Sequence, residues 1–193
     1  MTMEKLRKSA FVLGAGFIGM SVIDELLQAD YQVTALVRRQ AHADQLQAIG
    51  VSTLIGDLED SDLIAGQSSI SDVVIHTATA DHIPSAEAIL RGVQQRVEKG
   101  QQAVYIHNSG AGVLSDGAAG RYKTEKVFKD GTRHDVDSVP DTNPHRNVDN
   151  FIVSRQKEIG SGAKIAIMIP PLIYGCTIIL IISIWMKTLT LPR

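Results

Sequence analysis

The sequence holds one cysteine, few aromatic residues and no surplus of positive charge. Among 193 residues, aromatics make up 5% and the formal net charge is -2. Cys176 alone cannot form an internal disulfide, which excludes a disulfide-stapled secreted scaffold. Without a basic surface or a platform of stacking aromatics, nucleic-acid binding is not expected. Residues 1–9 are short and charged, unlike a secretory leader, so we expect a protein of a reducing, cytoplasmic compartment.

Metal sites and membrane spans have little support. The six histidines show no ligand spacing with one another or with Cys176, so no metal is expected. Residues 165–186 carry no charge and match the length of about 20 residues that spans a bilayer. However, Pro170, Pro171 and Gly175 would break a lipid-facing helix. We interpret the run as a buried strand, a proline turn and an apolar tail, and no membrane partner is expected; insertion is the alternative.

Glycines recur at a fixed spacing after the first apolar run. Residues 10–13 form that run, and Gly14, Gly16 and Gly19 follow as G-x-G-x-x-G before a segment of helical periodicity. Such glycines permit a sharp turn, a close approach to a pyrophosphate and tight packing of helix on strand, in that order. The alternative is a glycine-rich turn that binds nothing. The residues expected to bind a dinucleotide here are Gly14, Gly16, Phe17, Ile18 and Gly19.

Short apolar runs alternate with helical segments along the chain. Strands are expected at residues 10–13, 32–37, 51–55, 72–76, 103–107 and 164–169. Helices are expected after Gly19 and at residues 41–49, 84–99 and 145–158, with a helical turn at 59–65. Asn143 is expected as the cap of the last helix and Pro144 as its first helical residue. Nearly continuous apolar strands indicate a parallel sheet covered on both faces. We therefore predict an α/β fold, a doubly wound parallel (Rossmann) sheet of strand order 3-2-1-4-5-6, in one domain over residues 1–175.

The end of the second predicted strand bears on the choice of nucleotide. Arg38 and Arg39 follow it, and no carboxylate lies between Gln32 and Gln40. An acidic residue there would bind the ribose diol of NAD(H), whereas arginine suits the 2'-phosphate of NADP(H). We expect NADP(H) as the cofactor, with NAD(H) as the alternative. The structural alternative is a pair of solvated arginines that begins a helix.

Several segments together resemble one superfamily. They are LGAGFIG, the triplet at residues 56–58, VVIHTATA, YIHNSGAG and PPLIYG. In order and spacing they resemble the extended and atypical branch of the short-chain dehydrogenase/reductase superfamily, over about residues 10–175. The resemblance implies that Asp57 and Leu58 flank the adenine and that Ala78 and Thr79 line the cofactor. It also places Pro171, Leu172 and Ile173 on the nicotinamide side.

The same resemblance implies catalytic residues. Ser109 stands where the family places the serine that binds the substrate oxygen; a loop hydroxyl bonded to its own backbone is the alternative. Tyr122 and Lys126 have the spacing of the family's acid/base pair, which a helix would bring to one face. They precede the helix that should carry the pair, in which His145 and Asp149 occupy those places. Either Tyr122 and Lys126 reach the crevice from the preceding segment, or the chain belongs to a group without the usual pair.

The resemblance ends at Gly175. Relatives continue into a smaller carboxyl-terminal domain that closes over the substrate, and residues 176–193 match none of it. We expect a chain that lacks this domain, through truncation or a mispredicted gene model, and an aggregation-prone apolar tail. The family implies an oxidoreductase or epimerase acting on a small carbonyl or a nucleotide sugar. The alternative is a non-catalytic NADP-binding module that senses redox state or regulates; the oligomeric state stays open.

Overall fold

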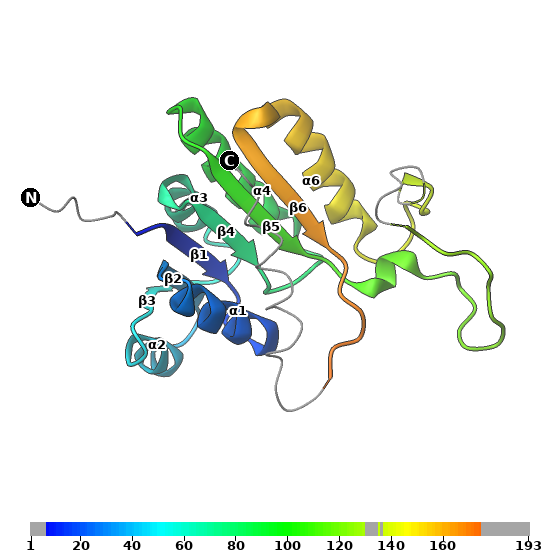
Figure 1. Ribbon diagram of the computed structural model, residues 1–193, viewed down its shortest axis with the longest axis horizontal. Coiled ribbons are helices and arrows are strands. Elements are labelled where there is room, and N and C mark those ends of the chain that lie inside the picture. Colours follow the sequence, from blue (N-terminus) through cyan, green and yellow to red (C-terminus); the bar gives the residue numbers. More distant parts are fainter. Residues whose placement is uncertain (1–6, 130–134, 136, 175–193) are drawn as a thin grey trace, which may run out of the picture.

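A single parallel sheet forms the centre of the molecule (Figure 1). The computed structural model describes residues 7–129, 135 and 137–174. Its strands are β1 Ser9–Leu13, β2 Gln32–Val37, β3 Ser52–Ile55, β4 Val73–His76, β5 Ala103–Asn108 and β6 Ala163–Met168. Their order is β3-β2-β1-β4-β5-β6, and every neighbouring pair is parallel. The predicted fold class and strand order are confirmed.

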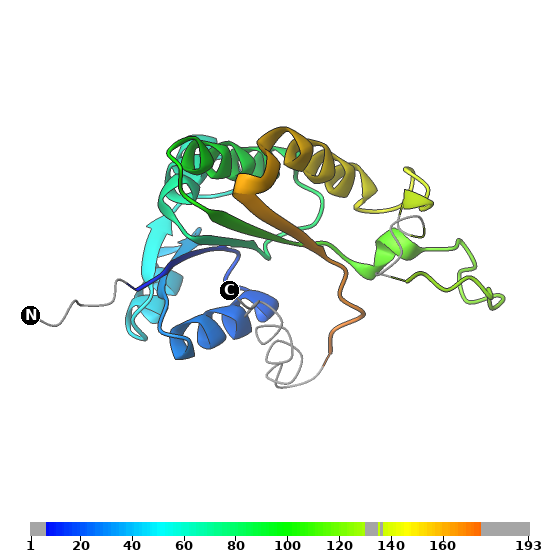
Figure 2. The same cartoon turned by 45° about the horizontal axis from the view of Figure 1, so that its top comes forward.

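Helices cover both faces of the sheet (Figure 2). The described residues form α1 Phe17–Gln28, α2 Gln40–Gln47, α3 Ser61–Ile70, α4 Ile83–Glu98 and α6 Arg146–Ile159, with short 3-10 turns η1 Ala111–Leu114 and η2 Gly160–Gly162. Helices α1 and α2 pack on one face, and α3, α4 and α6 pack on the other. This is the doubly wound arrangement that right-handed crossovers produce.

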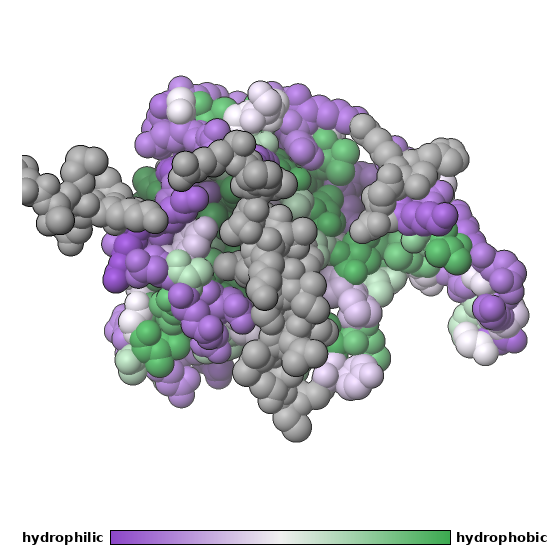
Figure 3. All heavy atoms as spheres, in the orientation of Figure 1, coloured by the Kyte–Doolittle hydropathy of each residue, from purple (hydrophilic) through white to green (hydrophobic). Residues whose placement is uncertain are grey.

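Side chains of the central strand alternate between two cores. Ala10 and Val12 of β1 join the cluster under α1 and α2, whereas Phe11 and Leu13 join the cluster under α3, α4 and α6. All four side chains are buried, because a strand exposes successive side chains to opposite faces. On the face shown in Figure 3, hydrophilic residues gather along the upper rim, over α4 and α6.

Two helix boundaries differ from the prediction. Helix α3 is longer than the turn expected at residues 59–65, and it crosses α4 where a side chain on Gly92 would overlap the Ala65 carbonyl. Helix α6 begins at Arg146 with His145 as its N-cap, so the prediction of Asn143 as the cap and Pro144 as the first helical residue is wrong. The Asn143 amide instead donates to the carbonyls of Val113 and Ser115. Tertiary contacts at both places override the local signals.

The charge-free run is described only in its first part. Strand β6 and the irregular residues 169–174 occupy the start of it, as expected. Cys176, Gly175 and the predicted apolar tail at 176–193 lie outside the described residues. Within the described ranges, no helix has the length and apolar character needed to cross a bilayer.

Candidate functional site

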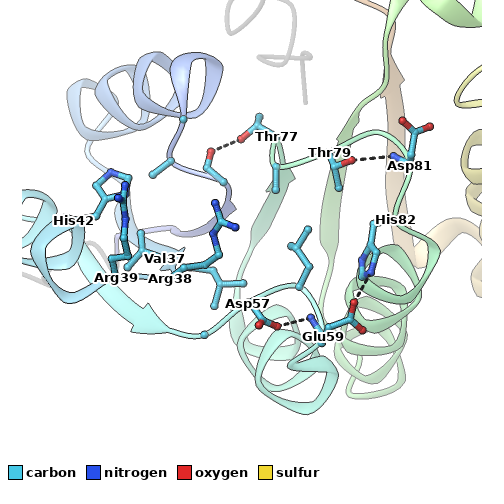
Figure 4. A pocket seen from close by; sticks show the side chains of 17 residues that line it. Val37, Arg38, Arg39, His42, Asp57, Glu59, Thr77, Thr79, Asp81 and His82 are labelled. Carbon is cyan, nitrogen blue, oxygen red and sulfur yellow. Dashed lines mark hydrogen bonds and ion pairs between the residues drawn. The ribbon is translucent and has the colours of Figure 1, made fainter.

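A groove of about 760 Å³ opens at the carboxyl edge of the central strands (Figure 4). Its size falls in the range of about 300–1,000 Å³ typical of small-molecule sites. Loops that follow β1, β2, β3 and β4 line it. The lining residues are Gly14, Ala15, Gly16, Leu36, Val37, Arg38, Arg39, His42, Gly56, Asp57, Leu58, Glu59, Thr77, Ala78, Thr79, Asp81 and His82. This is the position that the reversal of strand order predicts for a ligand.

The three glycines differ in what a side chain would meet. Gly14 has φ +96°, and a Cβ there would lie 2.5 Å from the backbone nitrogen of Ala78. A Cβ on Gly19 would overlap the carbonyl oxygen of Gly14, so the first turn of α1 packs directly on the loop. A Cβ on Gly16 would meet nothing within 4 Å. The loop therefore makes a sharp turn, leaves the backbone open at its second glycine and packs tightly at its third, as the motif predicts.

The loop is fixed from the neighbouring strand. The Thr77 hydroxyl, just after β4, donates to the carbonyl of Gly14 at 2.7 Å and lies 3.1 Å from that of Leu13. Gly16 is the N-cap of α1 and supplies no side-chain cap. The first-turn N–H groups of α1 thus have no side-chain acceptor at the cap, and with the helix dipole they favour an anion.

Positive charge lies at one end of the groove. Arg38 and Arg39 are exposed, and neither has an ion-pair partner in the part of the chain that the structure describes. His42, from the first turn of α2, lies at the same end (Figure 4). A phosphate there would meet unpaired guanidinium groups, which can bind it in a bidentate manner.

Hydrogen bonds within and between loops fix the floor of the groove and its end away from the arginines. The Asp57 carboxylate accepts from the Glu59 N–H at 2.8 Å, forming a tight turn after β3. Glu59 in turn pairs with Nε2 of His82 at 3.0 Å, across to the loop before α4 (Figure 4). His82 Nδ1 accepts from the Ser85 N–H and so caps α4, which leaves Nε2 as the nitrogen that carries the proton.

Two histidines end buried strands beneath the groove. His76 and His107 are adjacent across β4 and β5, with ring centroids 5.2 Å apart. Neither ring nitrogen of His76 has a hydrogen-bond partner among the described residues. Burial lowers the pKa of His76 to about 3 and that of His107 to about 4. Burial also raises the pKa of Tyr105, whose hydroxyl lies 3.2 Å from Nδ1 of His107. These are neutral interior groups, and neither histidine lines the groove.

The structure ties Ser109 to Asp149. Both side chains are buried, and the serine hydroxyl donates to Oδ2 of Asp149 at 2.9 Å. Burial raises the pKa of Asp149, while the bond from Ser109 acts in the opposite direction. The hydroxyl therefore does not bond to its own backbone, as the alternative interpretation would require. Ser109 is also not a lining residue of the groove.

Tyr122 and Lys126 are not on a helix and do not line the groove. Residues 121–129 have no regular structure and belong to a segment that projects from the sheet (Figure 1). Tyr122 is 60% exposed, and the Lys126 ammonium donates to Ser138 and lies over Phe128. The helical face expected for this pair does not exist, because no helix forms there.

The remaining predicted residues fall into two groups. Those that line the groove are Gly14, Gly16, Arg38, Arg39, Asp57, Leu58, Ala78 and Thr79. Those that do not are Phe17, Ile18, Gly19, Pro171, Leu172 and Ile173. Phe17 and Leu172 are largely exposed, at 54% and 84%. Because β6 carries residues 170–174 past the sheet edge, the proposed nicotinamide contacts lie off the groove lining.

Sequence reasoning missed several groove residues. Asp81 and His82 follow β4, His42 lies in the first turn of α2, and Glu59 lies in the loop between β3 and α3. The sequence could have indicated His82, because it stands two residues before Pro84, at the position of a helix cap. Their pairing across loops has no signature in sequence spacing. No three histidine, cysteine or acidic side chains of the described residues come together as metal ligands.

The sequence is similar to those of known NAD(P)H-binding proteins. A sequence model described as NAD(P)H-binding matches residues 14–147, from the first glycine to the start of α6. The oxidase ucsJ of Acremonium sp. is 34% identical over 157 residues, which cover 76% of this chain and 45% of ucsJ.

Solved structures share the fold. Yeast methylglyoxal/isovaleraldehyde reductase Gre2, complexed with NADPH, superposes with a TM-score of 0.60 at 20% identity, covering 88% of this chain and 59% of Gre2. The UDP-Glc/GlcNAc 4-epimerase of Campylobacter jejuni gives 0.61 at 14% identity, covering 84% and 53%. The chain thus spans about half the length of these relatives, at 45%, 59% and 53%.

Proposed function

The chain belongs to the NAD(P)H-binding family, and from that premise we propose that it is a member of the extended short-chain dehydrogenase/reductase superfamily, binds NADP(H) in the groove and reduces small carbonyl compounds. One observation carries the proposal: an open glycine loop at the end of β1 is continuous with unpaired arginines at the end of β2.

The groove fits each charged part of NADP(H). The pyrophosphate would lie over Gly16, where a Cβ would meet nothing within 4 Å and the first turn of α1 presents N–H groups. The 2'-phosphate would lie at Arg38 and Arg39. Asp57 and Leu58 line the groove beside the arginines and would flank the adenine. This orientation directs the nicotinamide toward Thr79 and Asp81.

The reaction class is inferred from relatives and from the cofactor. Reduced nicotinamide supplies a hydride when bound. The residues of this chain would hold it, exclude water and deliver a proton to the substrate. Gre2 is named for methylglyoxal and isovaleraldehyde, and these aldehydes are therefore the first probes.

Calorimetric titration of NADPH and NADH into the purified chain tests the cofactor. We expect NADPH to bind at least tenfold more tightly. The double variant Arg38→Ala/Arg39→Ala should weaken NADPH binding by about 10- to 100-fold and NADH binding by less than about twofold, because one charge-assisted phosphate contact is worth about 1.5–3 kcal/mol.

Arg91→Ala is the matched control, since Arg91 pairs with Asp62 and does not line the groove. It should leave both affinities unchanged. A preference for NADH, or equal weakening of both nucleotides by the arginine variant, would contradict the assignment.

A second candidate is a non-catalytic NADP-binding regulator. It is favoured by one observation: the expected tyrosine and lysine do not line the groove, and the Ser109 hydroxyl is bonded to Asp149. Loss of NADPH absorbance with methylglyoxal or isovaleraldehyde separates the two functions. A regulator would bind NADPH and oxidise none of it.

A further inference from the structure

We propose that His145, oriented by Asp81, is the proton donor to the substrate carbonyl, in the role the missing tyrosine would have; this rests on the proposed function. Nδ1 of His145 lies 2.7 Å from Oδ1 of Asp81. Asp81 lines the groove in the loop between β4 and α4, at the end opposite the arginines (Figure 4). The ion pair therefore brings a histidine from the start of α6 to the rim of the cofactor groove.

The backbone holds the imidazole in an unusual setting. His145 has φ 68°, a left-handed conformation that few non-glycine residues adopt. Its side chain is 22% exposed, so the ring is partly shielded yet reachable from solvent. Held by Asp81 on one side and by α6 on the other, the ring has a fixed direction.

Two glycines leave room for the free nitrogen. A Cβ on Gly110 would lie 3.0 Å from Nε2 of His145, and a Cβ on Gly112 would lie 3.2 Å from it. Gly110 has φ -154°, extended backbone that any residue adopts, so conformation does not require glycine there. Glycine is required there because a side chain would collide with the imidazole of His145. Gly110 also directly follows Ser109, so Nε2 faces the loop where the family places its substrate-binding serine.

The electrostatics suit an acid. A carboxylate that accepts a hydrogen bond from Nδ1–H orients the ring and stabilises the imidazolium, leaving Nε2 to donate a proton. Nε2 of His145 has no hydrogen-bond partner among the described residues. The other charged or titratable groups around the ring are Asp149, Arg146 and His107.

Other histidines at this edge cannot take the role. His82 uses both ring nitrogens, one on Glu59 and one on Ser85. His76 and His107 are fully buried below the groove. Of the histidines that the structure describes here, His145 alone combines a carboxylate partner with an unengaged nitrogen.

The proposed step balances. With the cofactor held at the glycine loop, its reduced nicotinamide would supply the hydride and its electron pair to the carbonyl carbon and would leave as the oxidised cofactor. The carbon–oxygen π bond opens, and the oxygen takes the proton from Nε2 of His145. The products are an alcohol, oxidised cofactor and a neutral imidazole, which regains its proton from water.

The experiment compares His145→Gln, Asp81→Asn and a control, Asn147→Gln, on the exposed side of the same helical turn. NADPH affinity is measured by calorimetry, and turnover is measured with methylglyoxal and isovaleraldehyde. We expect H145Q to keep NADPH affinity within about twofold and to lose at least 100-fold in kcat, in line with the contribution of general acid catalysis. D81N should lose about tenfold in kcat and keep NADPH affinity within about twofold. N147Q should match the wild type.

A readout that needs no turnover is the nitrogen-15 NMR spectrum of His145 in the unliganded protein. The Nδ1 proton should be hydrogen-bonded in the wild type and lose that signature in D81N. The proposal is overturned if H145Q keeps more than a third of kcat, or if the wild type binds NADPH and reduces neither aldehyde. Failure to bind NADPH at all would instead refute the proposed function, and the proton-donor role with it.

Discussion

At the scale of single residues, the glycine loop separates folding from binding. In Gly19→Ala the new methyl would overlap the Gly14 carbonyl, a backbone atom, so α1 must shift. We expect a loss of about 1–3 kcal/mol, the usual cost of overpacking. Gly16→Ala meets nothing within 4 Å and should cost about 1 kcal/mol or less, yet its methyl would stand where a pyrophosphate approaches.

Urea unfolding and NADPH titration of both variants check this. G19A should show the lower midpoint, and G16A the weaker NADPH binding at nearly native stability. If G16A bound NADPH as the wild type does, the phosphate would not lie over that glycine.

Tyr122 gives a second prediction at this scale. Its ring is 60% exposed, and it does not line the groove. Tyr122→Phe should therefore keep kcat, KM and the unfolding midpoint within experimental error, since surface substitutions usually change stability by less than about 0.5 kcal/mol. Steady-state kinetics with methylglyoxal, run beside H145Q, is the measurement. A tenfold loss in Y122F would restore the tyrosine to the mechanism.

At the scale of elements, a half-buried ion pair joins several elements at the amino edge of the sheet. Arg96, in the last turn of α4, is 8% exposed and pairs with Asp72, which precedes β4. The same carboxylate accepts from the backbone N–H of Ser9 at 2.7 Å, and Arg96 donates to the Gln102 carbonyl at 2.8 Å. The pair thus links α4, β1, β4 and the entry to β5.

Removing one partner should leave the other charge poorly solvated. Arg96→Met is expected to destabilise the protein by about 2 kcal/mol, below the value of about 3–5 for fully buried pairs because the Asp72 side chain is 35% exposed. Chemical unfolding measures this, with Arg91→Met, on the exposed face of α4, as the control. NADPH affinity should not change, since the pair lies at the edge opposite the groove. Equal stability of the two variants would show that the pair contributes little.

Elements were predictable where a local pattern matches the burial. Each strand is a short and mainly apolar run, so all six were predicted, and their order followed from crossover handedness. Helix α3 was predicted too short because Gly66, Ser68 and Ser69 are weak helix formers. Its length depends on packing against α4, where Gly92 allows the close crossing. That contact is tertiary and leaves no periodic signal.

The residues of the candidate site were likewise predictable only where a local sequence pattern encodes them. The glycine loop and the arginines were predictable, because a motif encodes a turn and a strand end encodes a position. The pairs Asp81–His145 and Ser109–Asp149 join residues far apart in the chain, and spacing says nothing about them. Tyr122 and Lys126 show the converse: i, i+4 spacing has meaning only where a helix forms.

At the scale of the whole molecule, the buried histidines make stability depend on pH. In the unfolded chain their pKa values are near 6.5, whereas burial lowers them to about 3 for His76 and about 4 for His107. Below pH 6.5 the unfolded state therefore binds protons that the folded state does not. The stability present above pH 6.5 is lost as the pH falls toward the folded values, by about 1.4 kcal/mol per pH unit for each histidine. Asp149, whose pKa is raised, contributes with the opposite sign at acidic pH.

The substitution His76→Leu isolates this effect. Neither ring nitrogen of His76 has a partner among the described residues, so a buried apolar side chain of similar volume should leave the unfolding free energy at pH 7 equal or higher. Between about pH 6 and pH 4 the variant should lose stability more slowly, and the difference from the wild type should grow by about 1.4 kcal/mol per pH unit. Asp149 and the surface carboxylates are present in both proteins, so their contributions largely cancel. Urea unfolding followed by circular dichroism at pH 7, 6, 5 and 4.5 measures the difference; a constant offset at every pH would mean that His76 titrates in the folded protein as it does in water.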